Sequence, residues 1–479
     1  MTKPSTKSNI SYNIIYQVLV MILPFVTAPY LSRIIGSEGV GIYSYTHSIA
    51  NYFTLFSLMG LANYGNRSIA QSRDNRQLLK TNFSEIYTMQ ILFSSLSLFV
   101  YIIGVLLFGG EYRTILCIQM LYVLSAGLDI SWFYYGMEKF KIMVIRNAIV
   151  KIITTICIFV FVKSVDDLWK YAFIMATGSL VSQITLWARI KSIVIFKIAS
   201  WRNFRKHIKS NLILFIPVIA VSLYRVMDKI MLGAISTMEQ TGIYENSDKL
   251  VTLPLTIIAS IGTVMMPKMS NIFARGNSNQ SYRLIRDSMQ FIVALSSGMM
   301  FGMAAIAQVF APIYYGNEFI KCGTMIMVMS PILLFGSIAN VIRTQYLIPK
   351  SKDKIYIISV ILGAVLNMLI NLLCIPKLGA MGAVIGTIVA EFTVMLVQCM
   401  CVRKDLEFST YMKDSWLYIV SGIVMFVLIK LIQKNAVASL SNVFIQILFG
   451  VLVYGIMSAL LMFVFSRDRF LHFKNMFIR

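Results

Sequence analysis

Residues 91–108 read ILFSSLSLFVYIIGVLLF, an apolar run without a charged side chain. A second run, 443–465, reads VFIQILFGVLVYGIMSALLMFVF. A helix needs about 20 apolar residues to cross the hydrocarbon core of a bilayer, so both runs are long enough to span it. Neither run alternates in the way that the strands of a membrane barrel do. The sequence therefore predicts an all-α polytopic membrane protein.

The rest of the chain has the same character. Hydrophobic residues make up 58% of the 479 residues, charged residues 13%, and the mean hydropathy is +0.75. A soluble domain is about half apolar and a quarter charged. The first apolar run has no small-residue cleavage site, so we expect no cleavable signal peptide. About fourteen spans are predicted, at 10–35, 39–62, 82–108, 113–135, 143–163, 168–189, 209–233, 243–266, 286–310, 322–346, 355–375, 380–402, 414–433 and 441–465.

The net charge of +23 arises from 43 Lys and Arg against 20 Asp and Glu. Such a balance is also typical of nucleic-acid binding. Here, however, the basic residues concentrate in every second loop and in both tails, which is the positive-inside pattern of membrane proteins. The pattern accounts for most of the charge without a nucleic-acid partner. It predicts a multi-pass protein with both termini in the cytoplasm.

Two similar stretches indicate an internal repeat. IIGSEGVGIYSY (34–45) and IMLGAISTMEQTGIYENS (230–247) each combine an apolar run, a glycine-containing turn and Gly-Ile-Tyr. We expect both to form short outer hairpins whose glycines serve the turn rather than a phosphate. Six spans per copy give parallel repeats, an arrangement that favours transport by alternating access. The predicted parts are a six-helix lobe with a basic linker (1–207), a second six-helix lobe (208–402), and two further helices with a basic tail (403–479).

The linker within 188–208 is expected to lie on the inner surface as a basic amphipathic helix. No set of residues with catalytic or metal-ligand spacing is evident. The glycines near residue 36 do not follow a strand, so they do not match a nucleotide-binding loop. We therefore expect no catalytic residues and no bound metal.

Charges at membrane depth are costly and are frequently functional. Arg225 lies about 24 Å along its span and shares a helical face with Asp228 and Lys229. It is either part of an ion pair that holds helices together or a cation that binds an anionic headgroup, with Asp228 orienting it. Glu391 lies about 16 Å into its span, either as a neutral link between helices or as a coupling group for H⁺ or Na⁺.

Five further charged residues have the same two readings, structural or functional. Lys249 and Arg33 lie toward the outer ends of their spans, and Arg146 and Lys151 lie in the first turns of the fifth span. Long basic side chains in these places commonly reach the interface, but they also suit a cavity wall. Asp129, near the inner end of the fourth span, is either a structural cap or part of a cavity.

Three stretches resemble a known family. They are LMGLANYGNRSIAQSRDN (58–75), LDISWFYYGMEKFKIMVIRN (128–147) and SLYRVMDKIMLGAISTMEQTGIYENSDKLVTLPLTI (222–257). With the fourteen spans, they are similar to the polysaccharide-transporter family of the multidrug/oligosaccharidyl-lipid/polysaccharide exporter superfamily. Within it they resemble the Wzx-type oligosaccharide repeat-unit flippases.

The resemblance implies a transporter rather than an enzyme. Such proteins move undecaprenyl-diphosphate-linked oligosaccharides across the bacterial plasma membrane for capsule, O-antigen or exopolysaccharide synthesis. It implies a basic cavity for the headgroup, coupling to a cation gradient (H⁺ or Na⁺), and contact with membrane lipids, with other polysaccharide-assembly proteins as further candidate partners. A multidrug cation exporter of the same superfamily and a lipid II flippase stay open as alternatives. The headgroup candidates are Arg225, Lys249, Arg33, Arg146 and Lys151, and the coupling or orienting candidates are Asp228, Glu391 and Asp129.

Overall fold

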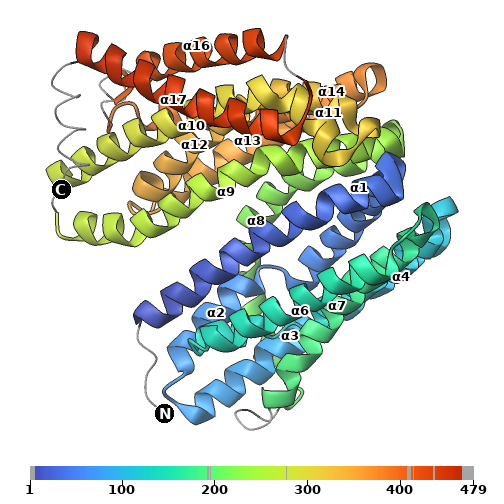
Figure 1. Cartoon of the computed structure of the whole chain (residues 1–479). Helices are drawn as coiled ribbons and strands as arrows, with labels where there is room; N and C mark the ends of the chain where they lie inside the picture. Colours follow the sequence, from blue (N-terminus) through green and yellow to red (C-terminus); the bar gives the residue numbers. More distant parts are fainter. Residues whose placement is uncertain are drawn as a thin grey trace. The chain divides into compact units, whose positions relative to one another are not determined.

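The computed structural model describes residues 6–190, 194, 196–276, 278–406, 411–413, 415–434 and 437–466, and every regular element in these ranges is helical (Figure 1). This confirms the predicted all-α class. The helices are α1 (Thr6–Leu58), α2 (Leu61–Ser72), α3 (Arg76–Phe108), α4 (Arg113–Gly127), α5 (Ser131–Gly136), α6 (Phe140–Phe161), α7 (Leu168–Ile190), α8 (Trp201–Ile235), α9 (Met238–Ala274), α10 (Ser278–Tyr315), α11 (Ile320–Met329), α12 (Ile332–Ile342), α13 (Asp353–Leu378), α14 (Ala380–Val402), α16 (Ser415–Gln433) and α17 (Leu440–Phe465).

Within the described ranges, 11 helices are long and apolar enough to cross a membrane, or up to 13 if each of two bent pairs forms one span. The first of these, Leu19–Ser72, holds two predicted spans, because Gly36 interrupts α1 with φ 68°. Figure 1 shows α1 reversing direction. A left-handed φ of this kind favours glycine, so the predicted turn residue is confirmed. With this helix divided at Gly36, the upper total agrees with the fourteen predicted spans.

The second predicted hairpin is wrong in its details. Gly233 and Gly242 both lie inside helices, and the chain turns at residues 236–237, where the Thr237 side chain caps α9. Gly233 instead permits close packing, since an added Cβ would lie 2.2 Å from Cδ2 of Tyr45 in α1. A glycine that packs a helix against its neighbour has the same sequence signature as a glycine that forms a turn.

The predicted amphipathic helix in the linker is also wrong for the residues that the structure describes. Residues 188–190 complete α7, residues 196–200 are not helical, and α8 begins at Trp201. Residues 191–193 and 195 lie outside the described residues. The basic residues that follow Trp201 therefore belong to the first turns of α8 itself.

The chain divides into two compact units, residues 1–234 and 235–479. In the first unit, α1 packs against α3, α4 and α6, and α2 packs against α5. In the second unit, α10 packs against α11, α12 and α16, and α13 packs along α14. The predicted lobe boundary after residue 207 falls inside α8. All of α8 except its last residue belongs to the first unit. The three predicted domain ranges stay predictions.

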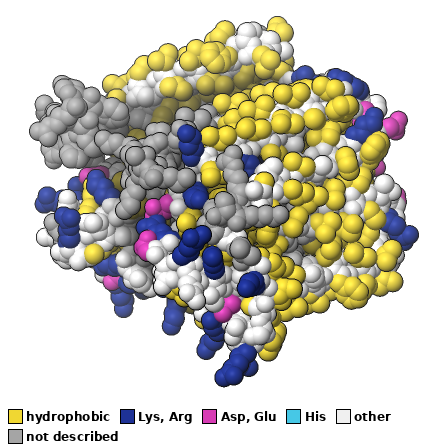
Figure 2. Space-filling model, turned by 90° about the horizontal axis from the view of Figure 1, so that it is seen from below, with side chains coloured by type: hydrophobic (Ala, Val, Ile, Leu, Met, Phe, Trp, Pro, Cys, Tyr) yellow, Lys and Arg dark blue, Asp and Glu magenta, His cyan; other side chains and the backbone are white. Residues whose placement is uncertain are grey.

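Large apolar side chains remain exposed over much of the surface. Phe108 is 84% exposed, Leu373 71% and Val451 64%. Figure 2 shows broad areas of hydrophobic side chains, with Lys and Arg gathered in separate groups. A soluble protein rarely exposes such large apolar patches, whereas lipid-facing helices must. The protein is therefore a multi-pass membrane protein.

Candidate functional site

Two of the stretches that carry the family resemblance pack together in the first unit. Trp132 of α5 is 1% exposed, and its indole Nε1 donates to Oε1 of Gln90 in α3 at 3.0 Å. The indole fits because α2 has Gly65 at the contact, where a Cβ would lie 2.7 Å from two ring carbons. Gly136 gives the same close approach to Ile69 on the other side. These motif residues therefore build the interface between α2, α3 and α5.

The break between α4 and α5 is stabilised by side chains. Nε2 of Gln90 donates to the carbonyl oxygens of Ala126 and Asp129, each at 2.8 Å, and so ties α3 to the chain at the end of α4. The Asp129 carboxylate accepts from the Ser131 N–H at 2.8 Å. This carboxylate therefore contacts the first residue of α5, and Arg146 lies close enough to interact with it, while both interpretations of Asp129 stay predictions.

A tight turn joins α5 to α6. A turn of the same form directly precedes α13 in the second unit. In the first turn Glu138 has φ 56°, and the Lys139 N–H donates to the Tyr134 carbonyl oxygen at 2.9 Å. In the second, Ser351 has φ 54°, and the Lys352 N–H donates to the Leu347 carbonyl oxygen at 2.8 Å. In both, the lysine directly precedes the helix. The two units therefore share this local turn geometry, and the predicted repeat itself stays a prediction.

Ion pairs hold both turns. Arg73 lies 2.5 Å from Glu138, and this hydrogen bond raises the pKa of the guanidinium. Lys352 lies 2.5 Å from Asp405, where its ammonium holds the pKa of the carboxyl below the ordinary value. Neighbouring Lys350 lies 5.0 Å from the ring centroids of both Phe273 and Tyr346. Arg73, Lys350 and Lys352 thus have structural partners, and their charge does not by itself mark a substrate site.

Two of the headgroup candidates, Arg146 and Lys151, lie on α6. Arg146 is half-buried, and Nη1 donates to the Ser182 carbonyl oxygen at 2.9 Å and to Gln183 Oε1 at 3.3 Å, both on α7. Its Nη2 donates to Asn147 Oδ1 at 2.6 Å. Lys151 is also half-buried and lies five residues further along α6. Arg146 therefore links α6 to α7 in addition to its proximity to Asp129.

Arg225 and Asp228 lie on α8 with opposite exposure. Arg225 is exposed, whereas Asp228 is 1% exposed. Tyr52 of α1 lies within electrostatic range of Asp228, and its hydroxyl donates to the Ser222 carbonyl oxygen at 3.2 Å. Arg225 is therefore accessible at the protein surface, whereas Asp228 is buried in the protein. Arg33 of α1 is exposed as well.

The remaining candidates lie in the second unit. Lys249 forms an ion pair with Glu245, one turn earlier on α9, at 3.0 Å. Glu391 of α14 is 8% exposed, near Gly336 of α12, where an added Cβ would lie 3.6 Å from Glu391 Oε2. The described residues contain no group of three or more His, Cys, Asp or Glu side chains placed to hold a metal ion.

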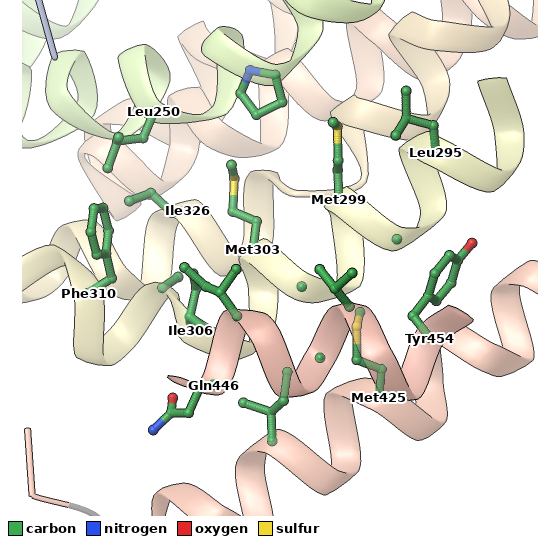
Figure 3. Close-up of a pocket in the computed structure, with 18 residues that line it drawn as sticks. Leu250, Leu295, Met299, Met303, Ile306, Phe310, Ile326, Met425, Gln446 and Tyr454 are labelled. Atoms are coloured by element: carbon green, nitrogen blue, oxygen red, sulfur yellow. The ribbon is translucent and has the colours of Figure 1, made fainter. Parts of the chain in front are cut away.

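The sequence did not reveal an apolar pocket in the second unit. Its volume is about 450 Å³, and Figure 3 shows the side chains of α9, α10, α11, α16 and α17 that converge on it. Two lining residues carry side-chain nitrogen or oxygen atoms, and both bond to protein. Gln446 accepts from Gln433 at 2.9 Å, and Tyr454 donates to the Ala294 carbonyl oxygen at 2.6 Å. The pocket is therefore suited to an apolar ligand. Its labelled lining residues include Leu250, Leu295, Met299, Met303, Ile306, Phe310, Ile326 and Met425.

Solved structures of membrane transporters share this fold. The lipid II flippase MurJ, in an inward closed conformation, is 18% identical with a TM-score of 0.75, covering 95% of this chain and 99% of that chain. An inward-facing multidrug resistance MATE family transporter of the MOP superfamily is 12% identical with a TM-score of 0.58, covering 82% of this chain and 99% of that chain. At these identities the likeness establishes the fold alone.

Sequence comparisons give the family. The family described as "Polysaccharide biosynthesis protein" matches residues 6–273. A protein of Shigella dysenteriae that is named as an O-antigen transporter is 25% identical over 355 residues, which are 71% of this chain and 86% of the relative. One from Escherichia coli (strain K12) with the same name is 23% identical over 357 residues, which are 74% and 86%. The chain belongs to the polysaccharide biosynthesis protein family, as the resemblance of its motifs indicated.

Proposed function

We propose that this protein is a flippase that moves undecaprenyl-diphosphate-linked oligosaccharide repeat units across the bacterial plasma membrane for surface polysaccharide synthesis. The observation that carries the proposal is the match of more than half the chain to a polysaccharide biosynthesis family. It is supported by relatives named as O-antigen transporters that align over 86% of their own length. The related proteins are transporters, and the protein is not an enzyme.

The substrate has two chemically different parts that must be accommodated together. A diphosphate and a glycan are polar, whereas a polyprenyl chain is apolar. The pocket bounded by α9, α10, α16 and α17 offers only apolar contacts, because its two polar side chains are bonded to protein. Burying apolar surface there contributes about 25 cal/mol per Å². We assign the pocket to part of the lipid chain.

The diphosphate needs cations. Arg225 is our first candidate, because this exposed arginine lies deep in a predicted membrane span and a planar guanidinium binds phosphate in bidentate geometry. Arg146, Lys151, Lys249 and Arg33 are further candidates. Arg146 and Lys249 already bond to neighbouring side chains, so a phosphate would compete with those partners. Coupling to H⁺ or Na⁺ would use carboxylates within the helical units, for which we propose the buried Asp228 and Glu391 and the half-buried Asp129.

The fold is also that of the two alternatives, a multidrug exporter and a lipid II flippase, and it does not favour either one. The names of the sequence relatives favour the oligosaccharide flippase. The positive-inside pattern supports an inner-membrane protein with both termini in the cytoplasm.

The proposal is tested by mass spectrometry of polyprenyl-diphosphate-linked oligosaccharides in cells with and without this gene. A flippase predicts that one complete repeat unit accumulates on the lipid when the gene is deleted. Re-expression of the wild-type chain should clear it. An unchanged lipid pool with intact surface polysaccharide would refute the proposal and favour a multidrug exporter.

A further inference from the structure

A buried cluster of titratable side chains lies in the first unit, away from every candidate discussed so far. His207, in the second turn of α8, has a side chain that is 7% exposed. Its Nε2 lies 2.8 Å from Oε2 of Glu85 on α3, and its Nδ1 lies 2.5 Å from the Tyr64 hydroxyl on α2. The ammonium of Lys206 reaches the same Glu85 oxygen at 2.9 Å. These are the charged and titratable groups that face His207 from α2, α3 and α8.

From this geometry we infer that Glu85, His207 and Tyr64 form a proton-binding site that makes the contact between α3 and α8 depend on pH. Its ligand is a proton, exchanged with the aqueous phase on the side where Lys206 is 59% exposed. The consequence for transport rests on the proposed flippase function. The proton site itself does not.

The His207 ring can form hydrogen bonds with the same two partners, Glu85 and Tyr64, whether it is neutral or protonated. An ionised carboxylate only accepts hydrogen bonds, so Nε2 carries a proton toward Glu85 in either state. In the neutral ring, Nδ1 accepts from the Tyr64 O–H. In the cationic ring, the Nδ1 proton is donated to the Tyr64 oxygen, whose own proton turns away. A proton can therefore enter or leave without a rearrangement of the heavy atoms.

The charge of the cluster changes with that proton. Glu85 has a side chain that is 4% exposed and is balanced by Lys206 while His207 is neutral. Protonation of His207 adds a second cation beside the same carboxylate and strengthens the link from α8 to α3. An opposite charge within about 4–6 Å favours the charged form of a titratable group. Glu85 therefore favours the protonated form of His207, in opposition to the burial of the ring.

The first turns of α8 are fixed on one side, so the changing contact is the one with α3. Gly60, at the start of α2 with φ 90°, lies so close to α8 that an added Cβ would be 3.0 Å from the Phe215 N and 3.2 Å from the Asn211 carbonyl oxygen. Tyr64 and His207 continue this α2–α8 contact one turn further along each helix. The same α8 carries Arg225, 18 residues or about 27 Å of helix beyond His207. The proton therefore changes the strength of a contact that holds the same helix that carries the candidate headgroup cation.

The test uses the full chain, labelled at histidine and held in lipid nanodiscs, with the imidazole signals followed by NMR across pH. The chain has three histidines, so the signal lost in His207→Asn identifies the site. We expect His207 to titrate, and its midpoint to fall by about 1–3 pH units in Glu85→Gln. Lys206→Gln, which removes a like charge at the exposed edge, should shift the midpoint in the opposite direction. A His207 signal that does not titrate, or that titrates alike in wild type and both variants, would overturn the proton site.

The consequence for transport is measured separately, as the pH profile of lipid-linked oligosaccharide flipping in proteoliposomes. We expect the profile to shift with the NMR midpoint in the same two variants. A profile that stays fixed while the midpoint moves would overturn the coupling of the site to transport. Absence of flipping at every pH, with a titrating His207, would contradict the proposed flippase function and leave the proton site established.

Discussion

Gly65→Ala is expected to destabilise the protein, because the motif stretches 58–75 and 128–147 meet at this residue. The new methyl carbon would lie 2.7 Å from two carbons of the Trp132 ring, well inside van der Waals contact. The ring cannot easily yield, since Nε1 is bonded to Gln90 and the indole stacks on Phe83 at a centroid distance of 5.6 Å. Overpacking of this kind costs about 1–3 kcal/mol. Replacing a helical glycine by alanine returns about 0.5–1 kcal/mol, which leaves a net loss of up to about 2.5 kcal/mol.

The matched control is Gly104→Ala, in α3 of the same unit. No atom lies within 4 Å of the Cβ that it would add, so only the gain in helix propensity remains. The two alanine variants should therefore change the melting temperature of the purified chain in detergent in opposite directions, Gly65→Ala downward and Gly104→Ala slightly upward. Equal melting temperatures for the two variants would refute the packing argument.

Three further predictions concern the ion pair, the pocket and the headgroup cation. Because Lys352 lowers the pKa of Asp405, their pair stabilises the protein above the ordinary carboxyl pKa of about 3.9, and the gain is lost as pH falls through the lowered value. Both side chains are more than a third exposed, so Lys352→Met should cost less than about 1 kcal/mol at pH 7 and nothing at low pH, as thermal melts at the two pH values will test. Gly302→Leu should fill the apolar pocket and slow flipping while the melting temperature is kept. Gly302→Ala, whose Cβ would lie 3.6 Å from Met425 Cε, should flip normally, and equal flipping rates for the two variants would exclude the pocket from transport. Arg225→Gln should lower flipping about tenfold or more, since a hydrogen bond to a charged group is worth about 1.5–3 kcal/mol, with Arg225→Lys less affected; wild-type flipping by Arg225→Gln would remove the residue from the site.

The membrane class of the fold could be predicted from sequence because hydrocarbon imposes a length and a composition on each span. Gly36 was predictable as a turn residue for a similar reason, since a left-handed φ at a break between apolar runs favours glycine. Gly233 was not, because its close contact with Tyr45 depends on the packing of α8 against α1. The sequence shows that a glycine is present, whereas only tertiary structure shows whether φ or a neighbouring ring requires it.

The candidate site was harder to predict than the fold. Charges such as Arg225 and Glu391 stand out in apolar spans, but their burial and partners depend on residues far away in the chain. The apolar pocket gave no sequence signal, since apolar lining residues look like any lipid-facing surface. The contact of Glu85 with His207 joins residues 122 positions apart. The sequence indicated this contact only in that Glu85 and His207 both lie near the predicted inner ends of their spans.

The most direct test of the central claim is flipping by the purified protein. The lipid-linked oligosaccharide that accumulates in the deletion strain would be reconstituted into liposomes with and without the protein, and its accessibility to an added glycosidase that cannot cross the membrane would be followed. We predict that the inner-leaflet fraction becomes accessible only in liposomes that contain the protein. If that fraction stays protected although the protein is folded and inserted, the chain is not a flippase for this lipid.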